Sequence, residues 1–219
     1  MILPKDFPKL ESPFVREEIN GTFICTPRIS DDYRWVFEPG QAVAVEKLDG
    51  TNTSIIVENG EVKSIHNRLN NIPLFRQGFA HFYEGIQNAI ERDYIAIEKL
   101  KDGQYFGELC GPKVNGNPLR LDEHVWFQFD FLRERDRFKF WDKYVETLAG
   151  KSDEEIFSSV SETFKGLWSL EHRRKGRTEF AEGIVFYNRN GWMCKLRRDM
   201  FQFYYENNPN AKRHKEKDI

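Results

Sequence analysis

The sequence predicts an α+β fold in which antiparallel sheets are flanked by helices. Three observations support this prediction: short runs of alternating apolar residues, tight turns that join these runs in pairs, and helical spacing between the pairs. The 219 residues contain no repeat, no linker and no low-complexity tract. We therefore expect one domain over residues 1–219, with a flexible basic tail from about residue 205.

The first predicted sheet lies within residues 42–67. The run AVAVEKL (42–48) is followed by TSIIVE (53–58), and the dipeptide Asn59-Gly60 joins the latter to EVKSIHN (61–67). Asn-Gly between alternating runs is a strong signal for a hairpin turn, because both positions need a positive φ. We expect a strand pair or triple here.

A helix and two further strands are predicted next. Between Leu74 and Leu100 the apolar residues keep helical spacing. Strands are then expected at QYFGEL (104–109) and at the aromatic, alternating run HVWFQFDFL (124–132).

The last third of the chain predicts a helix and a strand pair. Ser152 can cap a helix N-terminus while Glu155 reaches back to it, which is the capping-box pattern. Two strands are suggested by EGIVFYN (182–188) and WMCKLRR (192–198), with a turn at Asn190-Gly191 between them.

Charge and composition argue against a strongly basic nucleic-acid-binding protein, a cysteine metal site and a membrane protein. The net charge is −2, so no overall field indicates a nucleic-acid partner. Basic residues gather at 133–139 and 172–177, and each cluster is either a solvated face or a binding surface. The three cysteines have no metal-binding spacing and are expected to be reduced. No apolar run has the length of a membrane span, so we expect a cytoplasmic protein, or a viral protein acting in a host cytoplasm.

A lysine stands where the alternation predicts a half-buried strand. Lys47 lies near the end of the run 42–48 and is followed by Asp49 and Gly50. A lysine amine becomes a nucleophile once it has lost its proton, and an adjacent glycine lets a ligand approach closely. Alternatively, the amine extends to solvent at the strand end. Lys47 taken alone leaves both interpretations open.

Six motifs in order extend this interpretation. They are EKLDGTN (46–52), Arg68 in HNRL, FGELCGP (106–112), WFQFDF (126–131), EGIVFY (182–187) and CKLRR (194–198). Together they resemble the covalent nucleotidyltransferase superfamily of ATP-dependent ligases and capping enzymes, and most of all its RNA ligases of the RNA ligase 2 type. The resemblance implies an ATP-grasp-like ligase core and an RNA ligase (ATP), with a role in RNA repair.

The resemblance implies that Lys47 attacks the α-phosphorus of ATP and forms a lysyl-AMP intermediate. The AMP would then pass to an RNA 5′-phosphate, and a 3′-hydroxyl would displace it. Lys195 and Arg197 lie two apart on a predicted strand, so both face one side. Two cations aimed at the α-phosphate would stabilise the transition state. An exposed basic strand face is the alternative.

Further ligand contacts follow from the same resemblance. Glu182 would bind Mg²⁺ or Mn²⁺, which proteins hold through one or two carboxylates plus phosphate oxygens. Glu108 would bind ribose hydroxyls or a metal, and Arg68 the phosphate or ribose. Asp49 and Gly50 are counted among the ATP-binding residues. The alternatives are a surface acid for Glu108 and a loop cation for Arg68.

Base and sugar recognition is assigned to three residues. Glu46 would accept a hydrogen bond from the adenine amino group, which favours ATP over GTP. Asn52 matches a polar position near the nucleotide or the RNA. Trp126 would stack on adenine, and the alternative is that Trp126 is ordinary core.

The sequence also departs from the family. Little more than 20 residues follow CKLRR, too few for an added C-terminal domain. The RNA-binding surface would then be supplied by basic residues at 133–139, at 172–177 or in the tail, or by a partner protein. The alternatives are a capping-type guanylyltransferase, a DNA nick ligase and a non-catalytic RNA-binding module on the same fold. The expected partner is RNA with 5′-phosphate and 3′-hydroxyl ends.

Overall fold

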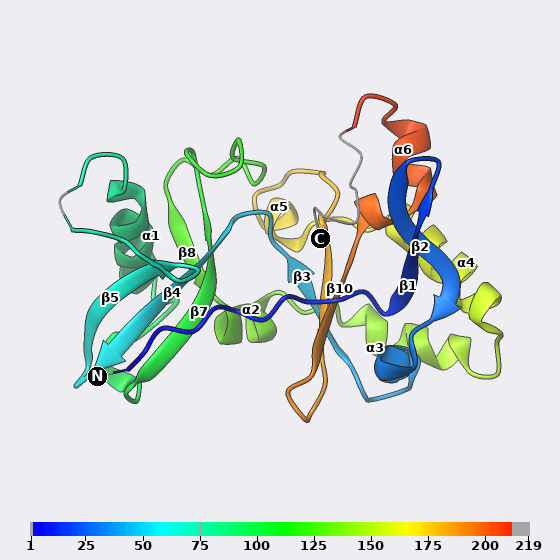
Figure 1. Cartoon of the computed structure of the whole chain (residues 1–219), viewed down its shortest axis with the longest axis horizontal. Helices are drawn as coiled ribbons and strands as arrows, with labels where there is room; N and C mark the ends of the chain where they lie inside the picture. Colours follow the sequence, from blue (N-terminus) through cyan, green and yellow to red (C-terminus); the bar gives the residue numbers. More distant parts are fainter. Residues whose placement is uncertain (1, 75, 212–219) are drawn as a thin grey trace. The chain divides into compact units, whose positions relative to one another are not determined.

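The computed structural model describes residues 2–74 and 76–211 and has the predicted α+β architecture (Figure 1). Its contacts divide into two compact units. Unit 1 is drawn from Met1–Lys9 and Leu48–Arg135, and unit 2 from Leu10–Lys47 and Asp136–Ile219. The chain therefore passes from unit 2 to unit 1 directly after Lys47. The expectation of one domain stays a prediction.

Unit 1 contains a five-stranded antiparallel sheet in the order β6-β5-β4-β7-β8. Its strands are β4 (Thr51–Glu58), β5 (Glu61–Asn67), β6 (Asn70–Asn71), β7 (Gly103–Cys110) and β8 (Val125–Gln128). Its helices are α1 (Ala80–Glu91), the 3₁₀ turn η2 (Ile97–Lys99) and α2 (Phe129–Arg135). Asn59 and Gly60 have φ values of 55° and 71°, which confirms the predicted hairpin turn.

The helix predicted between Leu74 and Leu100 is much shorter than expected. α1 begins at Ala80 and ends at Glu91, and Leu74 is 64% exposed. Gly78 and Asp93 have positive φ values, and this left-handed conformation interrupts a right-handed helix on either side. Phe82 and Ile86 of α1 do pack into the core of unit 1, so the helical spacing is confirmed over the central turns.

The aromatic run 124–132 is not one strand. β8 ends at Gln128, and α2 begins at Phe129. The Gln128 side chain stabilises this change, because its Oε1 accepts the Phe131 N–H at 2.8 Å and its Nε2 donates to Asp130 Oδ2 at 2.9 Å. Asp130 therefore lies on a helix and does not share a strand face with Trp126.

Unit 2 contains a two-stranded and a three-stranded sheet, both antiparallel. The strands are β1 (Phe14–Ile19) with β2 (Thr22–Ile29), and β3 (Val43–Lys47), β9 (Gly183–Tyr187) and β10 (Met193–Arg197) in the order β10-β9-β3. The helices are α3 (Phe140–Tyr144), α4 (Asp153–Lys165), α5 (Leu170–Arg174) and α6 (Gln202–Asn207). The 3₁₀ turns are η1 (Asp31–Phe37), η3 (Val145–Leu148) and η4 (Arg198–Met200).

The capping box of α4 is confirmed. Ser152 Oγ accepts the Glu155 N–H at 3.3 Å, and Glu155 Oε2 accepts the Ser152 N–H at 2.8 Å. The apolar side of α4 then enters the core of unit 2 through Val160 and Phe164, both fully buried.

The first residues of the predicted flexible tail are helical. Helix α6 continues to Asn207, and Tyr205 is only 8% exposed. Most of the predicted basic tail, from residue 212 to 219, lies outside the described residues. Among the residues that are described, no helix combines the length and the apolarity that a membrane span requires.

Candidate functional site

The three-stranded sheet brings the predicted lysine, glutamate and arginine to one end. Lys47 pairs with Gly183 across β3 and β9, and Gly183 pairs with Arg197 across β9 and β10. Glu182 directly precedes Gly183. Because neighbouring strands are antiparallel, the last residues of β3 and β10 lie beside the first residue of β9.

Lys47 and Glu182 form a partly buried ion pair. Lys47 Nζ donates to Glu182 Oε2 at 2.7 Å, and the two side chains are 22% and 24% exposed. Partial burial reduces competition from water, so this contact fixes the position of the amine better than an exposed pair would. The sequence placed both residues in the site without predicting that they touch.

Lys195 and Arg197 share one face of β10, as predicted. Cys194 and Leu196, which alternate with them, are fully buried, whereas Lys195 and Arg197 are half-buried. Burial, together with the nearby charges of Arg197 and Lys47, lowers the pKa of Lys195 to about 8. Lys195 is therefore held close to cations that would together attract a polyanion.

Arg197 has a close acidic neighbour. Its Nε lies 3.0 Å from Asp199 Oδ1, near enough for the charges to attract, although the two atoms are not aligned as a hydrogen bond. The Arg197 side chain is about one-fifth exposed. Its guanidinium is therefore steered by Asp199 while part of it stays accessible.

Gly183 allows the strands to meet at this end of the sheet. A Cβ at this position would lie 2.8 Å from Arg197 Cα and would also collide with the Leu196 carbonyl. Glycine is required for this close approach of backbones. Since Gly183 stands between Lys47 and Arg197 in the register, it also leaves no side chain between them.

Glu46 does not have the place that base recognition would need. It is 2% exposed, and its Oε2 accepts the N–H groups of Leu170 and Glu171 at 2.7 and 3.0 Å. These are free N–H groups at the start of α5, so Glu46 caps that helix. The predicted contact with adenine is therefore corrected to a structural one. Strand alternation could have revealed this, because neighbours such as Glu46 and Lys47 point to opposite faces.

Burial makes Glu46 a pH-dependent element of the fold. It raises the pKa of Glu46 from an ordinary 4.5 to about 7, although hydrogen bonds from Ser169, Glu171 and Leu170 oppose the rise. A carboxyl group with a raised folded-state pKa contributes its full stability below pH 4.5. That contribution is lost as the pH rises from about 4.5 to about 7, since the unfolded chain ionises first.

We expect Glu46→Gln to flatten this pH dependence. The amide oxygen of the substituted side chain can still accept the N–H groups of α5, but the amide cannot ionise, so the variant avoids a cost of about 3 kcal/mol or less above pH 7. Urea unfolding of both proteins between pH 4.5 and pH 8 measures this. A wild-type stability that falls no more steeply than that of the variant contradicts the assignment.

In unit 1, Asp49 and Gly50 are held by a residue that the sequence did not single out. Asn115 Nδ2 donates to Asp49 Oδ1 at 2.9 Å and to the Gly50 carbonyl at 2.6 Å. Asn115 has a φ of 48°, and the turn-forming run NGNP that it begins was the available signal.

Gly50 lets the chain pack closely against β7. A Cβ there would lie 2.7 Å from Cys110 Sγ and 2.8 Å from Glu108 Cγ, and it would collide with the Leu109 carbonyl. The close approach that requires glycine here is thus between the chain and β7.

Asn52 and Glu108 lie opposite each other in the register of β4 and β7. Directly opposed residues of an antiparallel pair have side chains on the same face. Both residues are half-buried. Asn52 Oδ1 is buried and has no hydrogen-bond partner among the described residues, which is rare for a polar atom. A ligand hydroxyl could supply the missing donor.

The other two predicted residues of unit 1 differ sharply in exposure. Arg68 is exposed, has a φ of 54°, and lies 3.3 Å from Asp6 through its Nη1. Trp126 has no exposed surface, packs in the core of unit 1, and donates its Nε1–H to the Thr53 carbonyl at 3.0 Å. Trp126 is thus core, as the alternative held, and it offers no ring face for adenine.

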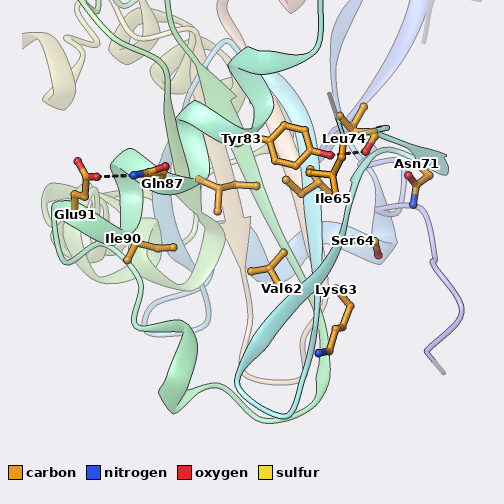
Figure 2. Close-up of a pocket in the computed structure, with 12 residues that line it drawn as sticks. Val62, Lys63, Ser64, Ile65, Asn71, Leu74, Tyr83, Gln87, Ile90 and Glu91 are labelled. Carbon is orange, nitrogen blue, oxygen red and sulfur yellow. Dashed lines mark hydrogen bonds between the residues drawn. The ribbon is translucent and has the colours of Figure 1, made fainter. Parts of the chain in front are cut away.

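No preformed metal cluster coincides with the predicted site in the part of the chain that is described. Among residues 2–74 and 76–211, no three His, Cys, Asp or Glu side chains are placed to hold a metal ion. The three cysteines are free and buried. A pocket of about 700 Å³ lies between β5 and α1, lined by residues such as Val62, Tyr83 and Ile90 (Figure 2). None of the predicted site residues lines this pocket.

Comparison with known proteins gives one family. Residues 40–201 match the family model described as RNA ligase, and this range includes every predicted site residue. No curated protein matches the chain.

Solved structures of a Naegleria gruberi RNA ligase have a similar fold. The structure with PPi has a TM-score of 0.50 and 16% identity over 94% of this chain and 60% of that one. A mutant with ATP and Mn also has a TM-score of 0.50, with 15% identity over 94% of this chain and 61% of that one. The chain thus spans about 60% of the length of the structures that it matches.

Proposed function

Because the chain belongs to the RNA ligase family, we propose that it is an ATP-dependent enzyme that joins an RNA 3′-hydroxyl to an RNA 5′-phosphate. One observation carries the proposal: the Lys47 amine is held 2.7 Å from Glu182, at the end of a sheet where Lys195 and Arg197 share a face. ATP and Mn in the Naegleria structure support the choice of nucleotide and of a divalent ion.

In the proposed first step, the uncharged Lys47 amine attacks the α-phosphorus of ATP. An N–P bond forms, the bond to pyrophosphate breaks, and the lysine loses a proton. In the second step, an RNA 5′-phosphate oxygen attacks the same phosphorus, the N–P bond breaks, and the departing lysine amine takes up a proton. In the third, the 3′-hydroxyl loses its proton as it attacks the activated RNA phosphate, and AMP leaves as the phosphodiester forms. The covalent intermediate divides one difficult condensation into easier steps.

The cations of β10 act on phosphate charge. Lys195 and Arg197 are proposed to bind the α-phosphate, where negative charge accumulates in the transition state. Asp199 orients the Arg197 guanidinium, and partial burial of both cations strengthens their attraction for phosphate.

Glu182 suits a divalent ion. A half-buried carboxylate beside the proposed nucleophile Lys47 matches the way in which Mg²⁺ is held, by one or two carboxylates together with phosphate oxygens. When bound, the ion would neutralise phosphate charge. Glu182 also positions the Lys47 amine, and Glu108 is a second proposed carboxylate for a metal or for ribose hydroxyls.

The remaining nucleotide contacts are proposed for unit 1. The unpartnered Asn52 Oδ1 is suited to a hydroxyl donor, and Glu108 lies opposite it. Arg68 is proposed to bind phosphate or ribose. Asp49 is proposed to act indirectly: its Oδ1 accepts the hydrogen bond from Asn115 that holds the turn at residues 49–50 in place. Glu46 and Trp126 are left out of the proposal, because both are buried by protein contacts.

We expect the purified chain to seal RNA ends with ATP and Mg²⁺ or Mn²⁺, and to form no covalent adduct with GTP. The measurement uses ATP and GTP labelled at the α-phosphate, with matched RNA and DNA nicks and single-stranded RNA as acceptors. An adduct with GTP alone would make the chain a guanylyltransferase, and sealing of DNA but not RNA would make it a DNA ligase. No adduct with either nucleotide would leave a non-catalytic binding module.

A further inference from the structure

Unit 2 exposes a stacked pair of aromatic rings. Trp168 and Phe180 lie opposite each other in an antiparallel bridge, which is fixed by a 2.9 Å hydrogen bond from the Ser169 N–H to the Glu179 carbonyl. Their ring centroids are 4.4 Å apart and their planes are nearly parallel, at 13°. The two residues remain 38% and 46% exposed, although side chains of this size are usually covered.

An arginine covers the other face of Phe180. Arg198 Cζ lies 4.0 Å from the Phe180 centroid, in a cation–π arrangement. Trp168 and Arg198 are both in van der Waals contact with that ring, so they occupy opposite faces of it. We call Trp168, Phe180 and Arg198 the aromatic ladder. No further ring can stack at the Arg198 end of the ladder, because the Arg198 guanidinium is held there by hydrogen bonds that it donates to the carbonyls of Phe164 and Lys165.

The exposed end of the ladder adjoins basic side chains. Trp168 directly precedes Ser169, which caps α5 by accepting the His172 N–H at 3.1 Å. Arg173 and Lys175 follow within α5 and at its end, and both are exposed. Lys175 lies 3.3 Å from Glu171, whose side chain also pairs with Arg174.

Two of the basic residues of α5 are engaged by buried acids. Arg174 also pairs with Asp136, and both acids of this group, Glu171 and Asp136, are buried. Arg173 and Lys175 keep exposed side chains within and at the end of this helix, which begins two residues after Trp168.

The other basic cluster, at 133–139, is largely neutralised. Arg133 pairs with Asp130, and Arg137 lies 2.6 Å from Asp142. Arg135 packs over aromatic rings, at 4.9 Å from the Phe131 centroid. Both clusters have an exposed aromatic neighbour, Phe140 at 41% and Trp168 at 38%, but Trp168 stacks face to face on a second exposed ring whereas Phe140 makes edge contacts.

The ladder lies at the same end of the three-stranded sheet as Lys47. Phe180 is two residues before Glu182, and Arg198 directly follows Arg197. The Arg198 N–H donates to the Glu182 carbonyl at 2.9 Å, which ties the two segments together. A strand bound along the ladder would therefore lie near the phosphate-binding cations of β10.

We propose that the aromatic ladder and the cations of α5 hold an unpaired nucleotide of the RNA substrate, with a base stacked on the outer face of Trp168 and phosphates beside Arg173 and Lys175. The inference rests on the proposed ligase function and names the surface that grips the RNA. Single-stranded nucleic acids are held in this way, by aromatic rings that accept any base and by cations along the backbone. The exposed cations Arg173 and Lys175, on the helix that follows Trp168, favour RNA over an apolar protein partner.

The test measures binding of the full chain to a short fluorescein-labelled RNA with a 5′-phosphate, by anisotropy. We expect Trp168→Leu, which keeps apolar bulk but removes the aromatic face, to weaken binding about tenfold. Trp168→Phe should stay within about threefold of the wild type, since it keeps a ring. Trp192→Ala is the matched control, because Trp192 is 55% exposed on the turn between β9 and β10, and it should bind as the wild type.

A second variant tests the cations independently. Arg173→Gln should reduce the slope of log affinity against log salt by about one, because one phosphate contact is lost. Unchanged RNA affinity in a folded Trp168→Leu protein, or an unchanged slope in Arg173→Gln, would overturn the proposal and leave these exposed aromatic rings to a protein partner. Adduct formation by the wild type with labelled ATP, without RNA, is a separate readout, so failure of the ligase proposal would be recognised on its own.

Discussion

Lys47→Ala is expected to reduce covalent labelling by ATP to background. The proposed phosphoramidate needs the Nζ of Lys47, and no other atom of the end of β3 can replace it. Loss of a nucleophile typically costs several orders of magnitude in rate, so we expect a decrease of at least about 10⁴-fold. The measurement is retention of the α-phosphate label on denatured protein after incubation with ATP and Mg²⁺.

Two variants make this result specific. Lys63→Ala is the matched control, since Lys63 also lies on a strand and pairs with a carboxylate, Glu61, but on an exposed surface. It should be labelled as the wild type. Lys47→Arg keeps a positive charge beside Glu182 and should still fail, because a guanidinium does not lose its proton. Labelling that survives in Lys47→Ala would refute the mechanism.

Lys195→Met is the second change for which we expect a large effect. It removes one of two cations from the face of β10 while keeping the length of the side chain, and the lost stabilisation of phosphate charge should slow adduct formation about 10²- to 10³-fold. Single-turnover labelling at saturating ATP measures the rate. Lys151→Met is a suitable control, because Lys151 is exposed in the loop before α4.

The pH profile of the same step gives a sharper test of Lys195. Because the pKa of Lys195 is lowered to about 8, the free enzyme loses this charge as the pH rises through 8. The rate at low ATP concentration should therefore fall above pH 8, and Lys195→Arg should move the fall to a higher pH, since arginine keeps its proton. An identical alkaline limb in both proteins would show that Lys195 does not control it.

Local patterns were enough to predict the strands that position these residues. The alternation in 42–48 and 192–198 predicted β3 and β10, and the Asn59-Gly60 dipeptide predicted the turn between β4 and β5. The shared face of Lys195 and Arg197 followed from the two-residue period of a strand. Each of these predictions depends only on residues that are close in the chain.

Roles that depend on distant contacts were not predicted. Glu46 looked like a ligand-binding acid because its partners, the N–H groups at the start of α5, lie about 125 residues away in the sequence. Trp126 could not be separated from a stacking residue, because its burial depends on α1 and β7. The need for glycine at positions 50 and 183 could not be predicted either, because the backbones that approach these residues belong to distant parts of the sequence.

The most direct test of the central claim is the position of AMP on the protein. The full chain is incubated with ATP and Mg²⁺, digested under conditions that preserve the phosphoramidate, and sequenced by tandem mass spectrometry. We expect AMP on the peptide that contains Lys47, with none on the peptide that contains Lys195. AMP on another residue, with Lys47 unmodified, would contradict it.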